Sequence, residues 1–274
     1  MATPATIREH YDFFAPLYRA FWGDHIHHGL FLNGMSDPKA AQLRMVEHCA
    51  QLAGIKPGWR VLDVGCGHGA TAIHLAKHHS CSVEGITISE RQVQFAREGT
   101  ARARLNGEVK FAIADADSYH FPVAAYDAVW TMESSEHFAD KQQYFRNVKR
   151  TLKPGGVLVL AAWTGDMQKA RVRLVAEVFL CPQLQTDEEY SEQITGAGLR
   201  VEHLEDVSAQ VTRTWEICRE RLRWSAPLVR TLPAKHRNFV KGIGLILEAY
   251  RSGQLGYSIV MARKHPASMR SDRL

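Results

Sequence analysis

Short, largely apolar runs alternate with amphipathic stretches along the chain from Trp59 to Trp163. The runs are RVLDV, CSVEGI, VKFAIA, YDAVWTM and GVLVLAAW, and helical stretches that begin near Gly69, Ser89 and Asp140 separate three of the pairs. Runs of this length are typical of buried strands, and the stretches between them have the spacing of helices. The alternation predicts an α/β fold in which a parallel sheet carries helices on both faces.

The segments on either side of this region are less regular. Ser36 and Asp37 can cap a helix that Pro38 starts, which predicts a helix over residues 36–54. Beyond Trp163 we expect a helix and loop (165–185), a helix (186–198), a strand (200–206), a long arginine-rich helical region (about 208–250) and a final strand, LGYSIVMARK. We therefore divide the chain into N-terminal lid helices (1–35), a ligand-binding core (36–165), remaining strands with an inserted helical cap (166–264) and a disordered tail (265–274).

The first predicted strand runs into a glycine-rich turn, VLDVGCGHGA, at residues 61–70. Its glycines Gly65, Gly67 and Gly69 have the spacing G-x-G-x-G, whereas the dinucleotide fingerprint places its third glycine one residue later. Asp63 also suits a positively charged ligand better than a pyrophosphate. S-Adenosylmethionine has an ammonium group, a sulfonium and no phosphate, so it fits this turn. A glycine cluster needed only for packing, and a nicotinamide or flavin site, are the alternatives.

Six pieces of the sequence carry a family resemblance: YDFFAPLYRAFWGDHIHHGLF, VLDVGCGHGA, GITISERQ, ADADSYHFP, YDAVWTMESSEHFADK and LKPGGVLVLAAW. With them the chain resembles the class I S-adenosylmethionine-dependent methyltransferases, in particular the γ-tocopherol methyltransferase-like group. That group is related to plant alkaloid N-methyltransferases and, further off, to cyclopropane fatty acid synthases. The resemblance implies a Rossmann-like, mostly parallel sheet of seven strands with helices on both faces and a helical lid, and S-adenosylmethionine as the cofactor.

The resemblance also assigns cofactor-binding positions beyond Asp63, Gly65 and Gly67. Thr87, with Ile88 and Gln92, stands where the family holds the ribose; Glu84, the nearest acid, lies about a residue too early. Further positions that match the family's adenine site are Asp115 and Ala116, and Asp117 is the alternative acid because the DAD sequence is ambiguous in register.

The segment MESSEHF follows the fourth predicted strand and offers two carboxylates and an imidazole: Glu133, Glu136 and His137. Methyl transfer needs aligned reactants, exclusion of water and removal of a proton from a neutral nucleophile. By resemblance to the alkaloid N-methyltransferases, Glu136 orients or charge-balances His137, and His137 accepts the proton. Glu133 is expected to support the cofactor or the loop. The alternative is purely structural, with Glu136 at a helix N-terminus and His137 packed in the loop.

The segment GDHIHHGLF holds His25, His27 and His28. Ligands on one short turn rarely complete a coordination sphere without a carboxylate, so we expect no metal. The resemblance implies that this loop folds over the cofactor, with His27 or His28 near its methionine end. An exposed polar turn is the alternative.

An aromatic stripe precedes that loop and comprises Tyr11, Phe13, Phe14, Tyr18, Phe21 and Trp22. It lacks the basic face of a membrane-surface helix. We interpret it as a lid helix that lines a pocket for a small hydrophobic acceptor, which Trp215, Trp224 and Tyr257 extend; core packing is the alternative.

Composition narrows the remaining classes. The net charge of +5 rests on arginines interleaved with apolar residues and an acid, as in CRERLRWSAPLVR, so no nucleic-acid binding is expected. No apolar run approaches the ~20 residues of a membrane span, so no stable membrane insertion is expected. Five cysteines without metal spacing favour a reduced, cytoplasmic location. A homo-oligomer is left open.

The predicted function is therefore methyl transfer from S-adenosylmethionine to a small hydrophobic acceptor. One alternative is a methyltransferase-like protein that acts as a cyclase or binding protein. The other is a lipid enzyme like the cyclopropane fatty acid synthases, which is disfavoured because those relatives carry a cysteine where this chain has Gly29.

Overall fold

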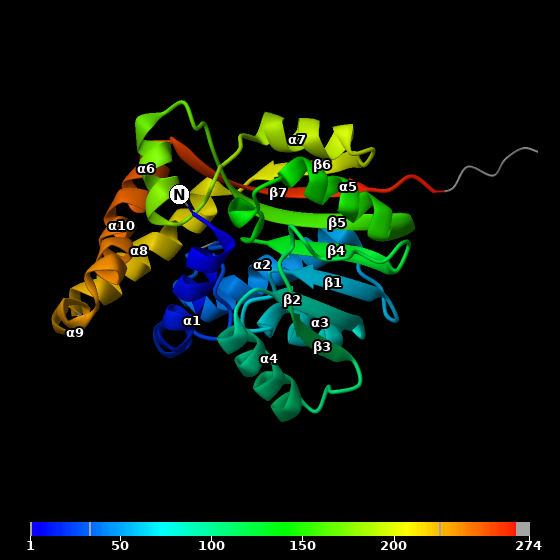
Figure 1. Cartoon of the computed structure of the whole chain (residues 1–274), viewed down its shortest axis with the longest axis horizontal. Helices are drawn as coiled ribbons and strands as arrows, with labels where there is room; N and C mark the ends of the chain where they lie inside the picture. The colour runs from blue at the N-terminus through cyan, green and yellow to red at the C-terminus, as the bar shows by residue number, and fades with distance from the viewer. Residues whose placement is uncertain (1, 33, 225, 267–274) are drawn as a thin grey trace, which may run out of the picture.

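Figure 1 presents a computed structural model of the chain, which describes residues 2–32, 34–224 and 226–266. Its centre is a seven-stranded sheet in the order β3-β2-β1-β4-β5-β7-β6. The strands are β1 (Arg60–Val64), β2 (Ser82–Thr87), β3 (Val109–Ile113), β4 (Tyr126–Met132), β5 (Leu152–Gly165), β6 (Arg200–Asp206) and β7 (Leu255–Arg263). The predicted Rossmann-like sheet of seven strands is confirmed.

The sheet is parallel except at β7. Strands β1 to β5 pair in parallel, and β7 lies antiparallel between β5 and β6. The direction in which strands are added to the sheet reverses between β1 and β4. Strands β2 and β3 are added on one side of β1, and β4 and the later strands lie on the other side. Ligands of such sheets bind at the carboxyl ends of the strands near this switch point.

Helices cover both faces of the sheet. One face carries α2 (Pro38–Ala53), α3 (Ala70–His79) and α4 (Glu90–Ala103), and their apolar sides form one hydrophobic cluster with the strands. The other carries α5 (Lys141–Thr151) and α7 (Asp187–Gly196), whose apolar sides form a second cluster. Strands β1, β4 and β5 are therefore mostly buried on both faces, which accounts for their nearly continuous apolar sequences, whereas the edge strand β3 exposes Lys110 and Ile113.

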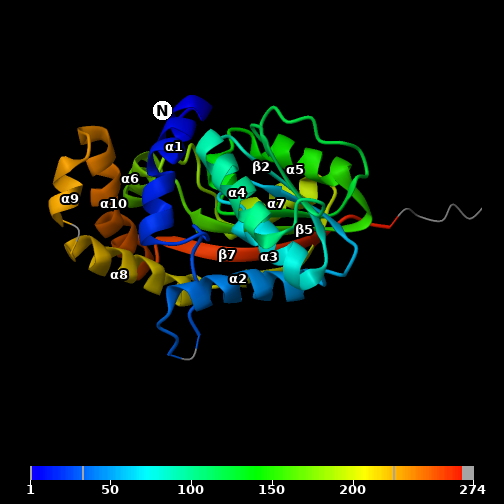
Figure 2. The ribbon, with the colours of Figure 1, turned by 90° about the horizontal axis from the view of Figure 1, so that it is seen from below.

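A group of helices gathers at one end of the molecule, as Figure 2 shows for α1, α8, α9 and α10. These cap helices are α1 (Pro4–Phe21), α6 (Ala170–Val178), α8 (Ser208–Trp224), α9 (Ala226–Thr231) and α10 (Ala234–Arg251). Helix α1 begins with a capping box between Thr3 and Thr6. Asp12 of α1 accepts hydrogen bonds from Ser89 Oγ (2.6 Å) and Arg91 N (3.1 Å) at the start of α4, which fixes the cap to the core.

No helix within the described residues is both long and apolar enough to cross a membrane. The predicted disordered tail at 265–274 falls mostly outside the described residues, which end at 266.

Candidate active site

A cavity of about 320 Å³ lies between the loops that follow β1 to β4 and the cap helices α1, α8 and α10. All ten residues predicted to bind the cofactor line it, and so does His137. They come from five separate segments of the chain, which the parallel sheet brings to one edge. The ten are His28, Asp63, Gly65, Gly67, Thr87, Ile88, Gln92, Asp115, Ala116 and Glu133.

Asp63, the second-last residue of β1, is a buried carboxyl group in the lining of this cavity. Its side chain is 3% exposed, and its Oδ2 atom has no hydrogen-bond partner among the described residues. Burial raises the pKa of this carboxyl to about 7. An unpaired carboxylate oxygen that lines a cavity is a site for a cation, so the residues present fit the ammonium-bearing end of S-adenosylmethionine.

Gly65 has no room for a side chain. Its φ of +78° lies in the left-handed region, and a Cβ there would lie 2.2 Å from Ser134 Cβ. Ser134 in turn donates a hydrogen bond from Oγ to Val64 O (2.7 Å), which draws the loop after β4 against the end of β1. The bare turn predicted from the sequence is therefore also the place where two active-site loops meet.

Thr87 and Gln92 contact each other at the end of β2. Thr87 donates from Oγ1 to Gln92 Oε1 (2.6 Å), so the Gln92 amide NH₂ is the donor left on a residue that lines the cavity. Glu84 is absent from the described lining residues; it accepts hydrogen bonds from Tyr119 and Tyr126 instead.

Asp115 and Asp117 both line the cavity, so the ambiguity between them stays open. Asp115 Oδ1 accepts from Asp117 N (3.0 Å), which tightens the turn after β3. Asp117 Oδ2 accepts from Ala139 N (3.0 Å) and joins this turn to the loop after β4.

Glu133 holds the histidine loop in place through His28. Its carboxylate accepts hydrogen bonds from His28 N (2.6 Å), His28 Nδ1 (2.8 Å), Tyr257 Oη (2.9 Å) and Trp163 Nε1 (3.3 Å). Burial raises the pKa of Glu133, but the interactions with His28 outweigh burial and leave it below its ordinary value. Glu133 also has a φ of 51°, an uncommon conformation that such a network can stabilise.

Tyr257→Phe is expected to lower the free energy of unfolding by about 1.5–3 kcal/mol, because it removes a hydrogen bond to a buried charged group. Urea denaturation at neutral pH measures this. The control is Tyr119→Phe, which removes a Tyr–Glu bond (3.2 Å) from a half-buried site. Its cost is expected to be about 1 kcal/mol or less, and equal losses in the two variants would contradict the role of the Glu133 network.

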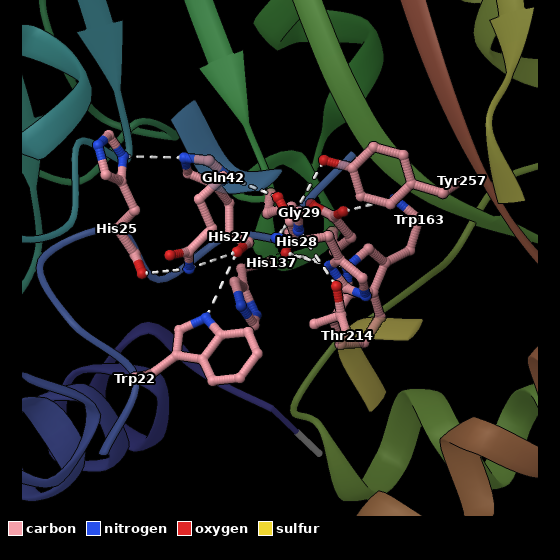
Figure 3. Close-up of polar contacts among 12 residues, drawn as sticks. Trp22, His25, His27, His28, Gly29, Gln42, His137, Trp163, Thr214 and Tyr257 are labelled. Carbon is pink, nitrogen blue, oxygen red and sulfur yellow. Dashed lines mark hydrogen bonds and ion pairs between the residues drawn. The ribbon is translucent and has the colours of Figure 1, made fainter. Parts of the chain in front are cut away.

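The other two histidines of the loop, His25 and His27, form hydrogen bonds with each other and with the backbone. His25 Nδ1 donates to His27 Nε2 (3.0 Å), and His27 Nδ1 donates to His28 O (2.8 Å), as Figure 3 shows. Gln42 of α2 donates to His25 O (2.7 Å) and His27 O (3.1 Å). His27 and His28 are buried, so the loop is a packed wall of the cavity and not an exposed turn.

His137 is held at both ring nitrogens. Nδ1 donates to Leu180 O (2.9 Å), so Nε2 is the acceptor for the hydroxyl of Tyr11 (2.8 Å). Burial lowers the pKa of His137 to about 4, although the Leu180 carbonyl opposes the shift. The imidazole is therefore neutral at physiological pH, with its basic nitrogen directed at a tyrosine of the lid helix.

The expected pairing of Glu136 with His137 is not present. Glu136 Oε1 accepts from Trp163 N (2.7 Å), and the side chain is absent from the cavity lining within the described residues. The pairing of β4 with β5 ends at Met132 and Ala161, and the last backbone bond there joins Glu133 N to Ala161 O. The buried N–H of Trp163 therefore has no strand partner on this side, and the Glu136 carboxylate accepts its hydrogen bond instead. Its second oxygen, Oε2, has no partner in the described structure, and burial raises the pKa of Glu136 to about 7.

Glu136→Gln is expected to stabilise the protein increasingly as pH rises. The folded-state pKa of Glu136 is raised to about 7, because burial disfavours the ionised carboxylate. The unfolding free energy of wild type therefore falls as pH rises from the pKa of this group in the unfolded chain to about pH 7. The variant should gain about 3 kcal/mol in unfolding free energy relative to wild type across that interval. Urea denaturation of both proteins from pH 4.5 to 8 tests this; a constant difference between them would contradict the raised pKa.

The far half of the cavity is aromatic and aliphatic. Five of the six stripe residues line it, as does Trp215; the exception, Phe13, stacks on His236 at a centroid distance of 3.7 Å. Tyr257 does not extend this wall, because its hydroxyl is buried on Glu133. The Trp224 side chain lies outside the described residues. Further wall residues that the sequence did not single out are His10, Phe179, Cys218, Phe239, Val240 and Ile243.

Comparisons with known proteins identify the family of this chain. Residues 2–244 match the family described as mycolic acid cyclopropane synthetase. The chain is 32% identical to the 27-O-demethylrifamycin SV methyltransferase of Amycolatopsis mediterranei (96% of this chain, 98% of that protein). It is 29% identical to the chloroplastic tocopherol O-methyltransferase of Arabidopsis thaliana (94% and 81%).

Among solved structures, the [4+2]-cyclase SpnF is similar with a TM-score of 0.87 and 26% identity, over 97% of each chain. The family match covers most of the sequence, and the first relative is similar over nearly its whole length. This chain thus belongs to the mycolic acid cyclopropane synthetase family and is an S-adenosylmethionine-dependent methyltransferase.

Proposed function

We propose that the chain transfers the methyl group of S-adenosylmethionine to a nucleophilic atom of a small apolar molecule bound under the cap helices. The observation that carries this proposal is one cavity that the predicted cofactor residues line from the edge of the sheet and aromatic residues line from the cap helices. The base His137 belongs to the same lining.

S-Adenosylmethionine supplies a methyl group already activated by its sulfonium. In this proposal Asp63 balances the positive charge of the bound cofactor, and the glycine turn and Thr87 with Gln92 hold its nucleoside. Helix α1 closes over the cavity and excludes water, which favours alignment of the two reactants. His28 and Glu133 shape the wall between cofactor and acceptor.

The proton of a neutral acceptor has a defined destination. As the acceptor atom bonds to the methyl carbon and the carbon–sulfur bond breaks, the acceptor's proton passes to His137 Nε2. That nitrogen is unprotonated, because Nδ1 carries the hydrogen that is donated to Leu180 O. Tyr11 is its hydrogen-bond partner in the ligand-free structure. Glu136 has no part in this step and acts by holding the Trp163 amide.

The acceptor class follows from the wall residues. Tyr11, Phe14, Tyr18 and Phe239 contribute aromatic rings to the lining, which also holds histidines. Such a surface binds a small apolar molecule with few charges. Two relatives are named as methyltransferases of demethylrifamycin SV and of tocopherol, which supports an acceptor of this kind.

A cyclase that binds the same cofactor without using it is the second candidate, favoured by the similarity to SpnF. Incubation with methyl-labelled S-adenosylmethionine and a panel of prenylated phenols and macrocyclic polyketides separates the two. Label in an organic-soluble product, with release of S-adenosylhomocysteine, is the expected result. Conversion of a panel member without transfer of label would favour the cyclase.

Lipid cyclopropanation is not proposed. By the family resemblance, enzymes with that activity carry a cysteine at the position of Gly29. A Cβ at Gly29 would lie 2.6 Å from Ala41 Cβ, so the position cannot hold a cysteine side chain without movement of α2.

We further propose a cytoplasmic location, which the five free cysteines support because reduced thiols are typical of that compartment. Whether copies of the chain associate stays a prediction for a sizing experiment.

A further inference from the structure

We propose that Glu47, His74 and His79 form a binding site for a late divalent transition metal such as Zn²⁺, separate from the cofactor cavity. His79 Nε2 lies 3.2 Å from Glu47 Oε1, and His74 Nε2 contacts the same oxygen. In the part of the chain that the structure describes, this is the one group of three such side chains whose ligand atoms all lie within 4.8 Å of one another.

The donor set determines the class of metal. Two imidazoles and one carboxylate suit Zn²⁺, Ni²⁺ or Cu²⁺, whereas Mg²⁺ and Ca²⁺ require mainly oxygen ligands. Three protein ligands leave a further coordination position for water, as in zinc sites with three side-chain ligands.

The site needs only small side-chain movements. With Zn–N and Zn–O bonds of about 2.0–2.2 Å, ligand atoms in a tetrahedral site lie about 3.3 Å apart. The Glu47 oxygen lies 3.2 Å from His79 Nε2 and closer still to His74 Nε2, so an ion would replace these two hydrogen bonds and move the carboxylate slightly outward, which long side chains on two helices allow. Side-chain exposures of 13% for His74, 20% for His79 and 37% for Glu47 leave a route for the ion.

The location suggests what the metal would join. Glu47 lies on α2, His74 lies on α3, and His79 ends α3, with both helices on one face of the sheet (Figure 2). Helix α3 follows the glycine turn, and α2 holds the histidine loop through Gln42. A bound ion would therefore connect the two helices that support the cofactor side of the cavity.

The sequence predicted no metal, because neither the cysteines nor His25, His27 and His28 have the spacing of a metal site. The proposed ligands carry no local signal, since Glu47 precedes His74 by 27 residues and the two meet only in the fold.

The chain offers a matched control. Glu205 Oε2 also contacts two histidines, His48 Nε2 (2.8 Å) and His203 Nε2 (3.2 Å), but these three are not among the described groups with metal-ligand spacing. Glu205→Gln therefore removes the same chemical group from a similar cluster, while Glu47→Gln removes it from the proposed site.

The experiment titrates Zn²⁺ alone into the untagged, chelator-treated full-length chain in competition with a chromophoric chelator. Wild type is expected to take up one equivalent of Zn²⁺ in competition with the chelator. Glu47→Gln should weaken that site by about tenfold or more, and His74→Ala should abolish it. Glu205→Gln should stay within about twofold of wild type. The Co²⁺-loaded chain should lack a sulfur-to-metal charge-transfer band.

Circular dichroism of each variant checks folding, and Glu47→Gln preserves shape at a partly exposed position. Three results would overturn the proposal: no stoichiometric site in wild type, unchanged affinity in Glu47→Gln, or an equal loss in Glu205→Gln. A thiolate band with Co²⁺ would also overturn it, since it would place the ion on cysteine.

Discussion

His137→Ala is expected to lower kcat by roughly 10²- to 10⁴-fold, the usual contribution of a positioned general base. The affinity for S-adenosylmethionine should stay close to wild type, because the loss falls on the proton transfer and not on cofactor binding. Single-turnover rates with the acceptor found by the label screen measure the first quantity, and calorimetry measures the second.

Two companion variants make this prediction specific. Tyr11→Phe removes the hydroxyl that occupies Nε2 in the ligand-free structure (2.8 Å) and leaves the base itself intact, so kcat should stay within about tenfold of wild type. His10→Phe changes another histidine of the cavity wall that packs against Phe14 and Phe239. Its kcat should stay within about threefold of wild type. Full turnover by His137→Ala would exclude His137 as the base.

Asp63→Asn is expected to weaken S-adenosylmethionine binding by roughly 10²- to 10³-fold, because it leaves the buried cation of the cofactor without its counter-charge. Burial raises the pKa of Asp63 to about 7 in the ligand-free chain. A cationic ligand should lower that pKa, so binding near pH 6.5 should release a proton. Calorimetry in buffers of different ionisation enthalpy measures both effects.

Glu84→Gln is the control for Asp63→Asn. Glu84 lies on the neighbouring strand β2 and accepts from Tyr119 and Tyr126, outside the described cavity lining. Its removal should leave cofactor affinity within about threefold of wild type. Unchanged affinity in Asp63→Asn, or equal losses in the two variants, would contradict the role given to Asp63. The unfolding free energy of Asp63→Asn at pH 8 should not fall, since the variant buries no charge.

Local sequence carried much of the fold and of the site. The apolar runs around Leu62, Val129 and Leu158 are strands buried on both faces. A continuous apolar run of this length predicts a buried strand even when the neighbouring strands are not known. Loops that follow parallel strands meet at one edge of the sheet. Gly65, Thr87 and Asp115 therefore line one cavity although they lie far apart in sequence.

The errors arose where long-range contacts choose between partners. Glu136 and His137 are adjacent in sequence but do not pair. The Glu136 carboxylate accepts a hydrogen bond from Trp163 N, and His137 Nδ1 donates one to Leu180 O. Leu180 adopts a φ of 58°, and no local signal predicts that a leucine does so. Tyr257 was likewise predicted to line the pocket because it is aromatic, but its hydroxyl donates a hydrogen bond to Glu133 in the core.

The most direct test of the account is a crystal structure of the chain with S-adenosylhomocysteine and an acceptor. We expect the nucleoside between Thr87 and Asp115, the amino group of the cofactor product at Asp63, and the acceptor's reactive atom beside His137 Nε2. A cofactor product bound elsewhere, or an acceptor whose reactive atom lies away from His137, would contradict it.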